Sequence, residues 1–357
     1  MNTGKPTLDV IIVAHDMRDY IYESLCSCSE ALRPLGGSLI LVDDGSSDDT
    51  VALAKAFSAS HPDIALTIVQ TANQGPGAAR NRGLKEVRSD YVCFVDADDL
   101  VNSAALVRII HAMHRYHADM ALPIAYCFDD GLRYTRPFGD AGLIKRLLGD
   151  NSALVTNSRD MPELLDTETS MCMRIFRAGF LQKHGIEFDD IRFCEDVYPS
   201  RAALLLSNAV LLTNETYYYY RQNRPQQRTS DTRPDTMDVF LAIDRSLQRG
   251  KETILDTSQG VQLTRRLSRL VMWGWELTPL GHQREFSERA YQTFSQVPRP
   301  WLRALRRDRR IEKHIRRLAC YFSGYYNKKN IDHFFCYRRP RLVDQLFGGL
   351  YRLTRGK

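Results

Sequence analysis

The chain has 357 residues, enough for one large domain with an appendage or for two domains. Its hydrophobic content of 43% is ordinary for a globular protein, and no apolar run approaches the ~20 residues of a membrane-spanning helix. The net charge of +6 conceals an asymmetry, because residues 297–357 hold 17 Lys and Arg against 4 Asp and Glu. Since the rest of the chain is therefore acidic, we expect two regions with different partners.

The N-terminus and the cysteines indicate the compartment. The first seven residues lack the charged and apolar segments of a signal peptide, so we expect a cytoplasmic protein. The eight cysteines form no CxxC pair and no zinc-like spacing, and most lie within apolar patterns. Reduced structural thiols are therefore expected, in keeping with the cytoplasm.

Strand and helix patterns alternate along the first hundred residues. Short apolar runs rich in β-branched residues predict strands over residues 8–14, 38–42, 66–70 and 91–95. Helices are predicted between them, over residues 19–32, from Ser47 or Asp48 to about residue 60, and over 78–87. This alternation with short connections predicts a doubly wound α/β layer around a parallel sheet.

Polar residues follow three of these strands, at the sheet edge where such folds bind ligands. They are Ala14-His15-Asp16, Asp43-Asp44-Gly45-Ser46 and Asp96-Ala97-Asp98-Asp99. Three carboxylates within four residues repel one another, and a divalent cation bound to a diphosphate would offset that repulsion. The alternative is an acidic turn that caps the next helix. Neither a GxGxxG motif nor a P-loop lysine motif is present. A Rossmann dinucleotide site and a P-loop phosphate site are therefore both disfavoured.

These strand ends, together with residues 73–83, closely resemble the nucleotide half of glycosyltransferase family 2. Further similar stretches follow in the family's order: Ser170–Arg177, the Glu-Asp motif in Phe193–Val197, and Tyr217–Arg221. The resemblance covers about residues 8–230. It implies a GT-A fold, which is a Rossmann-like, mostly parallel sheet flanked by helices. We expect a catalytic domain over residues 1–232, with a nucleotide half (about 8–100) and an acceptor half (about 101–232), and a helical, basic C-terminal region over 233–357.

The resemblance also implies donor contacts. Asp98 is the expected ligand of Mn²⁺ or Mg²⁺, and Asp96 would share the metal or contact the ribose. Asp99 would instead cap a helix starting near Asn102. Asp44 would contact uracil N3, although without the other motifs a plain turn with a helix cap would be the better explanation of residues 43–46. The other expected nucleotide contacts are Ala14, Asp16, Gly75, Arg80 and Arg221.

Arg80 has a simpler explanation, and the residues after the first strand depart from the family. The loop before Arg80 is rich in Gly, which lets a backbone approach a ligand closely, but Arg80 could also be a solvated residue at a helix start. After the first strand the family usually shows an aromatic residue and Asn, whereas this chain has His15 and Asp16. His15 can stack on a base, and Asp16 adds negative charge near the nucleotide.

The catalytic candidates lie a hundred residues downstream. An inverting transferase needs a general base for the acceptor hydroxyl, and the resemblance assigns this role to Asp196, with Glu195 orienting it or binding the acceptor. The alternative is an acidic helix N-terminus. Arg221, Arg224 and Arg228 are expected on a loop that closes over the diphosphate. The run Tyr217–Tyr220 is interpreted as a half-buried strand.

The sequence thus predicts an inverting glycosyltransferase that uses a nucleotide sugar, expected to be a UDP-sugar. Its acceptor would be a glycan or lipid-linked molecule in bacterial surface polysaccharide synthesis. The alternative is a non-catalytic GT-A-like protein that binds glycan or membrane. The C-terminal region interleaves Trp301, Leu302 and Leu305 with arginines, so it could dock on the inner face of the cytoplasmic membrane or pack on the catalytic domain. No nucleic-acid partner is expected.

Overall fold

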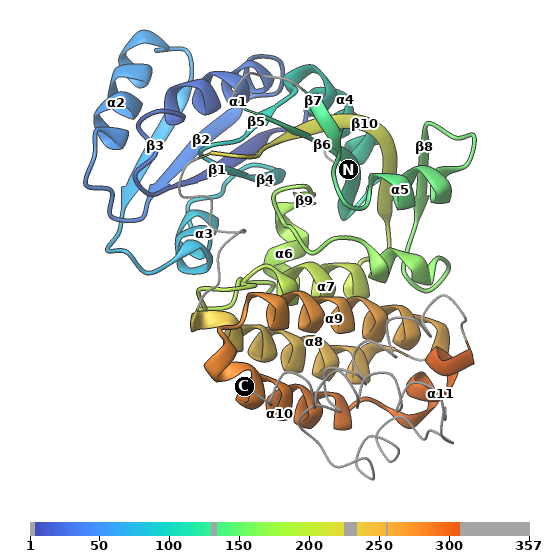
Figure 1. The fold of residues 1–357 in the computed structure, drawn as a ribbon. Coiled ribbons are helices and arrows are strands. Elements are labelled where there is room, and N and C mark those ends of the chain that lie inside the picture. Colours follow the sequence, from blue (N-terminus) through green and yellow to red (C-terminus); the bar gives the residue numbers. More distant parts are fainter. Residues whose placement is uncertain (1–3, 130–133, 225–233, 255, 308–357) are drawn as a thin grey trace. The chain divides into compact units, whose positions relative to one another are not determined.

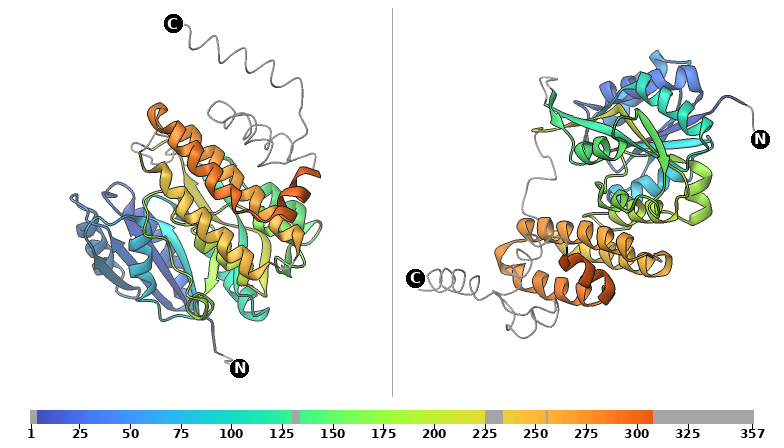
Figure 2. Two further views of the ribbon diagram at one scale, coloured as in Figure 1. Left: turned by 90° about the horizontal axis from the view of Figure 1, so that it is seen from below. Right: turned by 90° about the vertical axis from the view of Figure 1, so that its right-hand side faces the viewer.

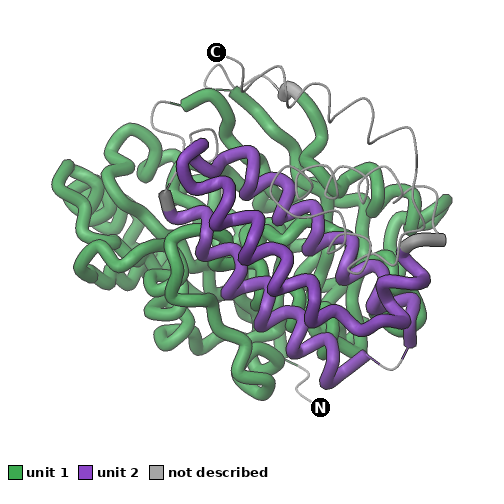
Figure 3. The backbone as a smooth tube through the Cα atoms, turned by 60° about the horizontal axis from the view of Figure 1, so that its bottom comes forward, with its two compact units in different colours: residues 1–229 green, residues 230–357 purple. Residues whose placement is uncertain are grey.

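The computed structural model describes residues 4–129, 134–224, 234–254 and 256–307. The chain divides into two compact units, residues 1–229 and residues 230–357 (Figure 3). No described helix is long and apolar enough to cross a membrane.

A single mixed sheet forms the centre of the first unit (Figure 1). Its described strands run in the order β3-β2-β1-β4-β9-β6-β10-β5, with β7 added to β6 and β8 added to β10. They are β1 (Leu8–Ala14), β2 (Gly37–Asp43), β3 (Ala65–Gln70), β4 (Tyr91–Asp96), β5 (Leu100–Val101), β6 (Met120–Phe128), β7 (Tyr134–Pro137), β8 (Ala153–Thr156), β9 (Ile175–Arg177) and β10 (Val210–Arg221). The first four strands pair in parallel, as do β6 and β10, whereas β9 is antiparallel to both β4 and β6.

Helices cover both faces of this sheet. The α-helices of the first unit are α1 (Ile21–Leu35), α2 (Thr50–Ser60), α3 (Pro76–Leu84), α4 (Ser103–Arg115), α5 (Ala141–Leu148), α6 (Ala178–His184) and α7 (Val197–Leu206), with a 3₁₀ turn η1 (Pro162–Asp166). Figure 1 shows α1, α2 and α4 on one face and α3 and α6 on the other. This arrangement confirms the predicted mostly parallel, Rossmann-like α/β layer.

Helix α3 packs closely on the sheet, and the candidate site lies at the edge where the carboxyl ends of the parallel strands meet. A Cβ added to Gly83 would lie 2.6 Å from Ile11 Cγ2 on β1, so glycine lets the helix sit directly on the sheet. All six residues of β4 except Asp96 are buried, and β1 is nearly as apolar. Because β1, β2 and β4 are parallel, their carboxyl ends and the residues that follow meet at one edge.

Some element boundaries differ from the prediction. Pro34 was expected to break the first helix, but α1 includes it and ends at Leu35, before Gly36 at a φ of 79°. The third helix begins at Pro76, two residues earlier than expected, because proline suits the first helical position. The expected strand in Ser170–Arg177 is formed only by the three residues of β9.

The second unit is helical. Its described helices are α8 (Val239–Thr253), α9 (Thr257–Leu277), α10 (Gln283–Ser295) and α11 (Arg299–Arg307), with 3₁₀ turns η2 (Pro234–Asp238) and η3 (Leu280–His282). Both views in Figure 2 show α8, α9 and α10 as neighbouring rods. The helical pattern predicted for residues 235–283 is confirmed.

The start of the predicted basic amphipathic segment packs inside this second unit. Trp301 and Leu305 are buried, and a Cβ added to Gly260 on α9 would lie 2.2 Å from the Trp301 ring. The apolar side of α11 is therefore covered by α9. The remaining basic segment, residues 308–357, lies outside the described residues.

Candidate active site

Three aspartates after β4 take three different partners. Asp96 lies at the strand end with a side chain that is 37% exposed. Asp98 is buried and forms an ion pair with Arg224. Asp99 is 1% exposed, and its carboxylate accepts hydrogen bonds from the Tyr218 hydroxyl at 2.7 Å and from the Arg221 backbone at 2.7 Å.

The prediction that Asp99 caps the next helix is wrong. The N-cap of α4 is Asn102, whose side chain accepts from the Ala105 backbone N–H at 3.1 Å. The strand β5 separates Asp99 from that helix, so its carboxylate turns toward β10 instead. Asp99 thereby ties the turn after β4 to β10.

Burial and mutual repulsion dominate the electrostatics of this turn. Burial raises the pKa of Asp98, and the charge of Asp96 raises it further while Arg224 opposes both effects. Burial, together with the charges of Asp98 and Asp96, holds the pKa of Asp99 well above its usual range. A cation beside Asp98 therefore relieves an unfavourable charge arrangement, and the Arg224 guanidinium fills that role.

Arg221 is not on a loop, as was expected, but is the buried last residue of β10. Its Nε donates to the Asp98 backbone carbonyl at 2.7 Å, and its Nη2 pairs with Glu23 of α1 at 2.8 Å. The guanidinium carbon lies 4.6 Å from the centre of the Phe128 ring. Arg221 thus holds the backbone of the aspartate turn in place. Arg224 does follow the strand, whereas Arg228 lies outside the described residues.

Arg80 connects the two predicted halves of the site. It projects from α3 and is 6% exposed. Its Nη2 lies 2.7 Å from Asp96 Oδ1, and its Nη1 lies 2.6 Å from Glu195 Oε1. The alternative of a solvated arginine is therefore wrong. A buried guanidinium between two carboxylates compensates charge on both sides of the site.

Asp196 stands at the first turn of α7, beside Glu195. It occupies the N-cap position, but its carboxylate makes no capping hydrogen bond, so helix capping does not account for it. Burial raises the pKa of Asp196 to about 7, and the charge of Glu195 contributes to the rise, while Arg80 opposes it. A carboxylate with this pKa can accept a proton near neutral pH.

The loop between β3 and α3 is held by Asp44. This carboxylate is 4% exposed and accepts from the backbone N–H groups of Gln74 at 2.9 Å and Gly75 at 2.8 Å. Gly75 has a φ of 100°, in the region that favours glycine. Asp44 is therefore a positioning residue for this loop, and it retains lone pairs that can accept from a base.

The end of β1 is joined to the loop after β2. The Ala14 carbonyl accepts from the Asp44 backbone at 2.8 Å. Asp16, at a φ of 53°, accepts from the Ser47 backbone at 2.7 Å, and this bond lowers the pKa of Asp16. His15 Nδ1 lies 2.8 Å from the Asp44 carbonyl. The negative charge of Asp16 is thus directed toward the neighbouring loop.

A cavity of about 420 Å³ adjoins the same loop, lined by Asn73, Gln74 and Ala78 on one side and Asp190–Arg192 on the other. The Arg192 guanidinium donates to the Asn73 carbonyl at 3.3 Å across it. Gly77 closes the approach between α3 and the segment before α7, since a Cβ there would lie 2.2 Å from the Asp189 carbonyl oxygen.

The sequence did not point to Cys172 or Glu23. The buried Cys172 Sγ lies 3.4 Å from Asp96 Oδ1 and 3.7 Å from Arg80 Nη2. The only sequence feature that could have identified Cys172 as a site residue was its position in the family-like stretch Ser170–Arg177. The six described cysteines are free thiols, as predicted. Glu23 lies on α1, and no motif links it to Arg221.

A divalent cation fits these residues only with help from a phosphate. No group of three or more His, Cys, Asp or Glu ligands occurs in the described ranges. Asp96 and Asp98 are nevertheless two carboxylates whose charges are now matched by Arg80 and Arg224. Mg²⁺ and Mn²⁺ commonly bind through one or two carboxylates and take further oxygens from a substrate phosphate and water. The donor set therefore fits a cation that arrives with a diphosphate.

Comparison with known proteins finds bacterial glycosyltransferases among the relatives of this chain. The glycosyltransferase GlyA of Streptococcus pneumoniae serotype 4 is 27% identical over 218 residues, which cover 60% of this chain and 30% of that protein. The poly(ribitol-phosphate) β-N-acetylglucosaminyltransferase TarS of Staphylococcus aureus is 24% identical over 235 residues, 65% of this chain and 38% of TarS. This chain thus spans well under half the length of these curated relatives.

The fold has a close counterpart among solved structures. The crystal structure of residues 1–349 of S. aureus TarS in complex with UDP-GlcNAc matches with a TM-score of 0.71 at 20% identity, covering 89% of this chain and 90% of that chain. This likeness confirms the predicted GT-A fold. The family model described as glycosyl transferase family 2 matches residues 9–180, which run from the second residue of β1 past the end of β9 and include the Asp96–Asp99 turn. Over residues 9–180, the chain therefore matches glycosyltransferase family 2.

Proposed function

We propose that this chain is an inverting glycosyltransferase that moves a sugar from a UDP-sugar to a glycan or lipid-linked acceptor in bacterial surface polysaccharide synthesis. The observation that carries the proposal is the Arg80 bridge. One guanidinium pairs with Asp96 on the donor side and with Glu195 beside Asp196 on the acceptor side. The bridge thereby joins residues from distant parts of the sequence that we assign to donor binding and to base catalysis.

Several contacts support a nucleotide donor. Asp44 organises the loop of Gly75, and Ala14 and Asp16 lie at the neighbouring strand end. Together they form a polar rim beside the 420 Å³ cavity. The similarly folded TarS was solved with UDP-GlcNAc, which favours a uridine donor here. We propose that the nucleoside lies along this rim, with its phosphates toward Asp96 and Asp98.

The chemistry follows from the placement of Asp196. Its carboxylate would take the proton from the attacking acceptor hydroxyl while the bond between the sugar and the diphosphate breaks, which inverts the anomeric carbon. Glu195 would hold Arg80 and orient this centre. Mn²⁺ or Mg²⁺ at Asp98 and Asp96, when bound, would stabilise the negative charge that develops on the leaving UDP. Arg224 would be released from Asp98 as the cation and the donor enter.

A second candidate function is a non-catalytic GT-A-like protein that binds glycan or membrane. The raised pKa of Asp196 favours catalysis over this alternative, because a binding protein has no need for a carboxylate titrating near 7. Membrane docking remains a separate proposal that depends on residues 308–357. Co-sedimentation with anionic liposomes tests it by comparing the full chain with a truncation after residue 307, which keeps α11. Equal sedimentation of the two proteins would contradict membrane docking.

Thermal unfolding with UDP, GDP and TDP, each with and without Mn²⁺, tests the proposed donor. A nucleotide that binds only the folded protein stabilises it by about 2.7 kcal/mol at one hundred times its dissociation constant. We expect UDP with Mn²⁺ to raise the melting temperature most. Nucleotide release from UDP-sugars with glycan acceptors then tests activity. The absence of release above that of Asp196→Asn with every donor and acceptor would favour the binding protein.

A further inference from the structure

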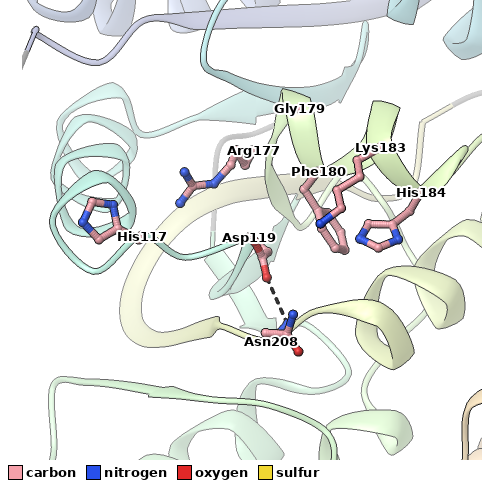
Figure 4. Close-up of a pocket in the computed structure, with 8 residues that line it drawn as sticks. All are labelled: His117, Asp119, Arg177, Gly179, Phe180, Lys183, His184 and Asn208. Atoms are coloured by element: carbon pink, nitrogen blue, oxygen red, sulfur yellow. Dashed lines mark hydrogen bonds between the residues drawn. The ribbon is translucent and has the colours of Figure 1, made fainter. Parts of the chain in front are cut away.

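A second cavity, of about 300 Å³, lies at the sheet edge opposite the candidate active site (Figure 4). Arg177 in its wall ends β9 and pairs with Tyr91, the first residue of β4, whereas Asp96 is the last residue of that strand. Asp119, also in the wall, directly precedes β6. The cavity is thus separated from the aspartate turn by the length of β4, about 20 Å.

Basic side chains dominate the lining. Arg177 and Lys183 carry permanent positive charges, and His117 and His184 add two imidazoles. Asp119 is the one carboxylate among the lining residues. Figure 4 shows Lys183 and His184 extending from α6 on one side, Arg177 and His117 on the other, and Asp119 between them. With neutral imidazoles the lining has a net charge of about +1, and protonated imidazoles raise it.

The Asp119 carboxylate is engaged in hydrogen bonds to the turn before β10. Its Oδ2 accepts from the Asn208 backbone at 3.0 Å, the Ala209 backbone at 3.2 Å and the Ser207 hydroxyl at 3.3 Å. The carboxylate therefore fixes the turn that leads into β10. Among the described residues, neither Arg177 nor Lys183 forms an ion pair with a carboxylate. The positive charges of Arg177 and Lys183 are thus not neutralised by a salt bridge to a described carboxylate.

The guanidinium of Arg177 is held in place by neighbouring groups. Its Nη2 and Nε donate to the Ala118 carbonyl at 3.0 and 3.3 Å, and its guanidinium carbon lies 6.0 Å from the centre of the Tyr91 ring. These contacts fix the guanidinium and leave Nη1 without a partner in the described part of the chain. A pre-positioned guanidinium that lines the same cavity as an ammonium group is suited to phosphate oxygens.

We propose that this cavity binds a phosphate group through Arg177 and Lys183, with an imidazole N–H of His117 or His184 as a further donor. The volume is at the lower end for ligand pockets and accommodates one phosphate with its ester substituents. The phosphate can come from solution or from the phosphodiester backbone of an acceptor polymer. The binding site is independent of the proposed transfer reaction, because none of its residues contributes to the Asp96–Asp99 turn or to Asp196.

Calorimetric titration of the full chain with inorganic phosphate tests this site, in the presence of UDP and Mn²⁺ to cover the donor site. The key variant is Lys183→Met, and the matched control is Lys55→Met, another exposed lysine, which lies on α2 and does not line the cavity. We expect phosphate affinity to fall about tenfold in Lys183→Met, since one charge-assisted hydrogen bond is lost, and to stay unchanged in Lys55→Met. Equal affinity in both variants, or no binding to the wild-type chain, would overturn the proposal.

The same titration with a short glycerol phosphate oligomer separates the two sources. An oligomer that binds more tightly than phosphate, competes with it and is weakened by Lys183→Met identifies a phosphodiester ligand. Phosphate binding that the oligomer does not displace identifies a free anion. Failure of UDP to bind the chain would count against the proposed transferase alone, because the comparison of Lys183→Met with Lys55→Met does not depend on it.

Discussion

Arg80 and Glu195, which are 115 positions apart in the chain, are joined by a 2.6 Å ion pair between Nη1 and Oε1. The other terminal nitrogen of Arg80 lies 2.7 Å from Asp96. One buried cation therefore pairs with a carboxylate at the end of β4 and with another just before α7.

Replacing Arg80 should destabilise the first unit. Arg80→Met leaves Glu195 without its cation in a site where that side chain is only 14% exposed. Loss of one partner from a buried ion pair costs about 3 kcal/mol or more. Urea unfolding measures the change, and Arg82→Met, which removes an exposed arginine of the same helix, is the control. Equal stability of the two variants would show that the bridge does not hold α3 and α7 together.

The activity of the enzyme should depend on pH through Asp196. The base must be ionised to accept a proton, so kcat/KM should rise with pH through about 7, the pKa of Asp196. Glu195→Gln removes a charge that raises this pKa and should move the acid limb to lower pH. Arg80→Lys weakens the guanidinium contacts that lower it and should move the limb up. Shifts in the same direction would contradict the assignment.

Arg224 should compete with the divalent cation for Asp98. Arg224→Gln removes the ion pair that occupies the carboxylate, so Mn²⁺ should bind more tightly in the presence of UDP. Calorimetric titration of Mn²⁺ into the UDP-saturated protein measures the affinity directly. The control is Arg82→Gln, which should leave it unchanged, whereas Asp98→Asn should weaken it about tenfold or more. Weaker binding in Arg224→Gln would show that Arg224 does not compete with the cation.

The sequence was sufficient to predict the parallel sheet and the edge at which Asp44, Asp96 and Asp98 lie, because apolar runs and strand-end carboxylates are local patterns. The role of Asp99 could not be predicted from the neighbouring sequence. Its partners, Tyr218 and the Arg221 backbone, come from β10, and Asn102 was the better cap. An arginine after a strand is ordinarily solvated, so burial of Arg221 depended on Phe128 and Glu23, which no spacing connects to it.

Distance along the chain also hid the second cavity. Arg177, Lys183 and His184 are scattered through a short strand and helix, where single basic residues are ordinary surface residues. They meet His117 only because β9 runs antiparallel to its neighbours and returns to the edge where β4 and β6 begin. The Arg80 bridge was equally invisible, since a Gly-rich loop followed by arginine does not identify two carboxylate partners.

Gly77 should tolerate no side chain. Its added Cβ would lie 2.2 Å from the Asp189 carbonyl oxygen and 3.1 Å from Glu195 Cβ, so Gly77→Ala must push α3 away from the segment before α7. We expect a loss of stability of about 1–3 kcal/mol and a larger loss of activity. Gly142→Ala on α5 meets nothing within 4 Å and should stabilise the helix by about 0.5–1 kcal/mol. Opposite signs in thermal unfolding are the expected result.

The most direct test of the account is a paired measurement on Asp196→Asn. Transfer from a UDP-sugar to glycan acceptors is followed by UDP release, and UDP binding with Mn²⁺ is measured by calorimetry on the same protein. Because Asp196 would act on the acceptor hydroxyl and not on the donor, we expect release to fall by at least about a hundredfold while UDP affinity stays within about twofold of the wild type. Undiminished release by Asp196→Asn would contradict the assignment of Asp196 as the base.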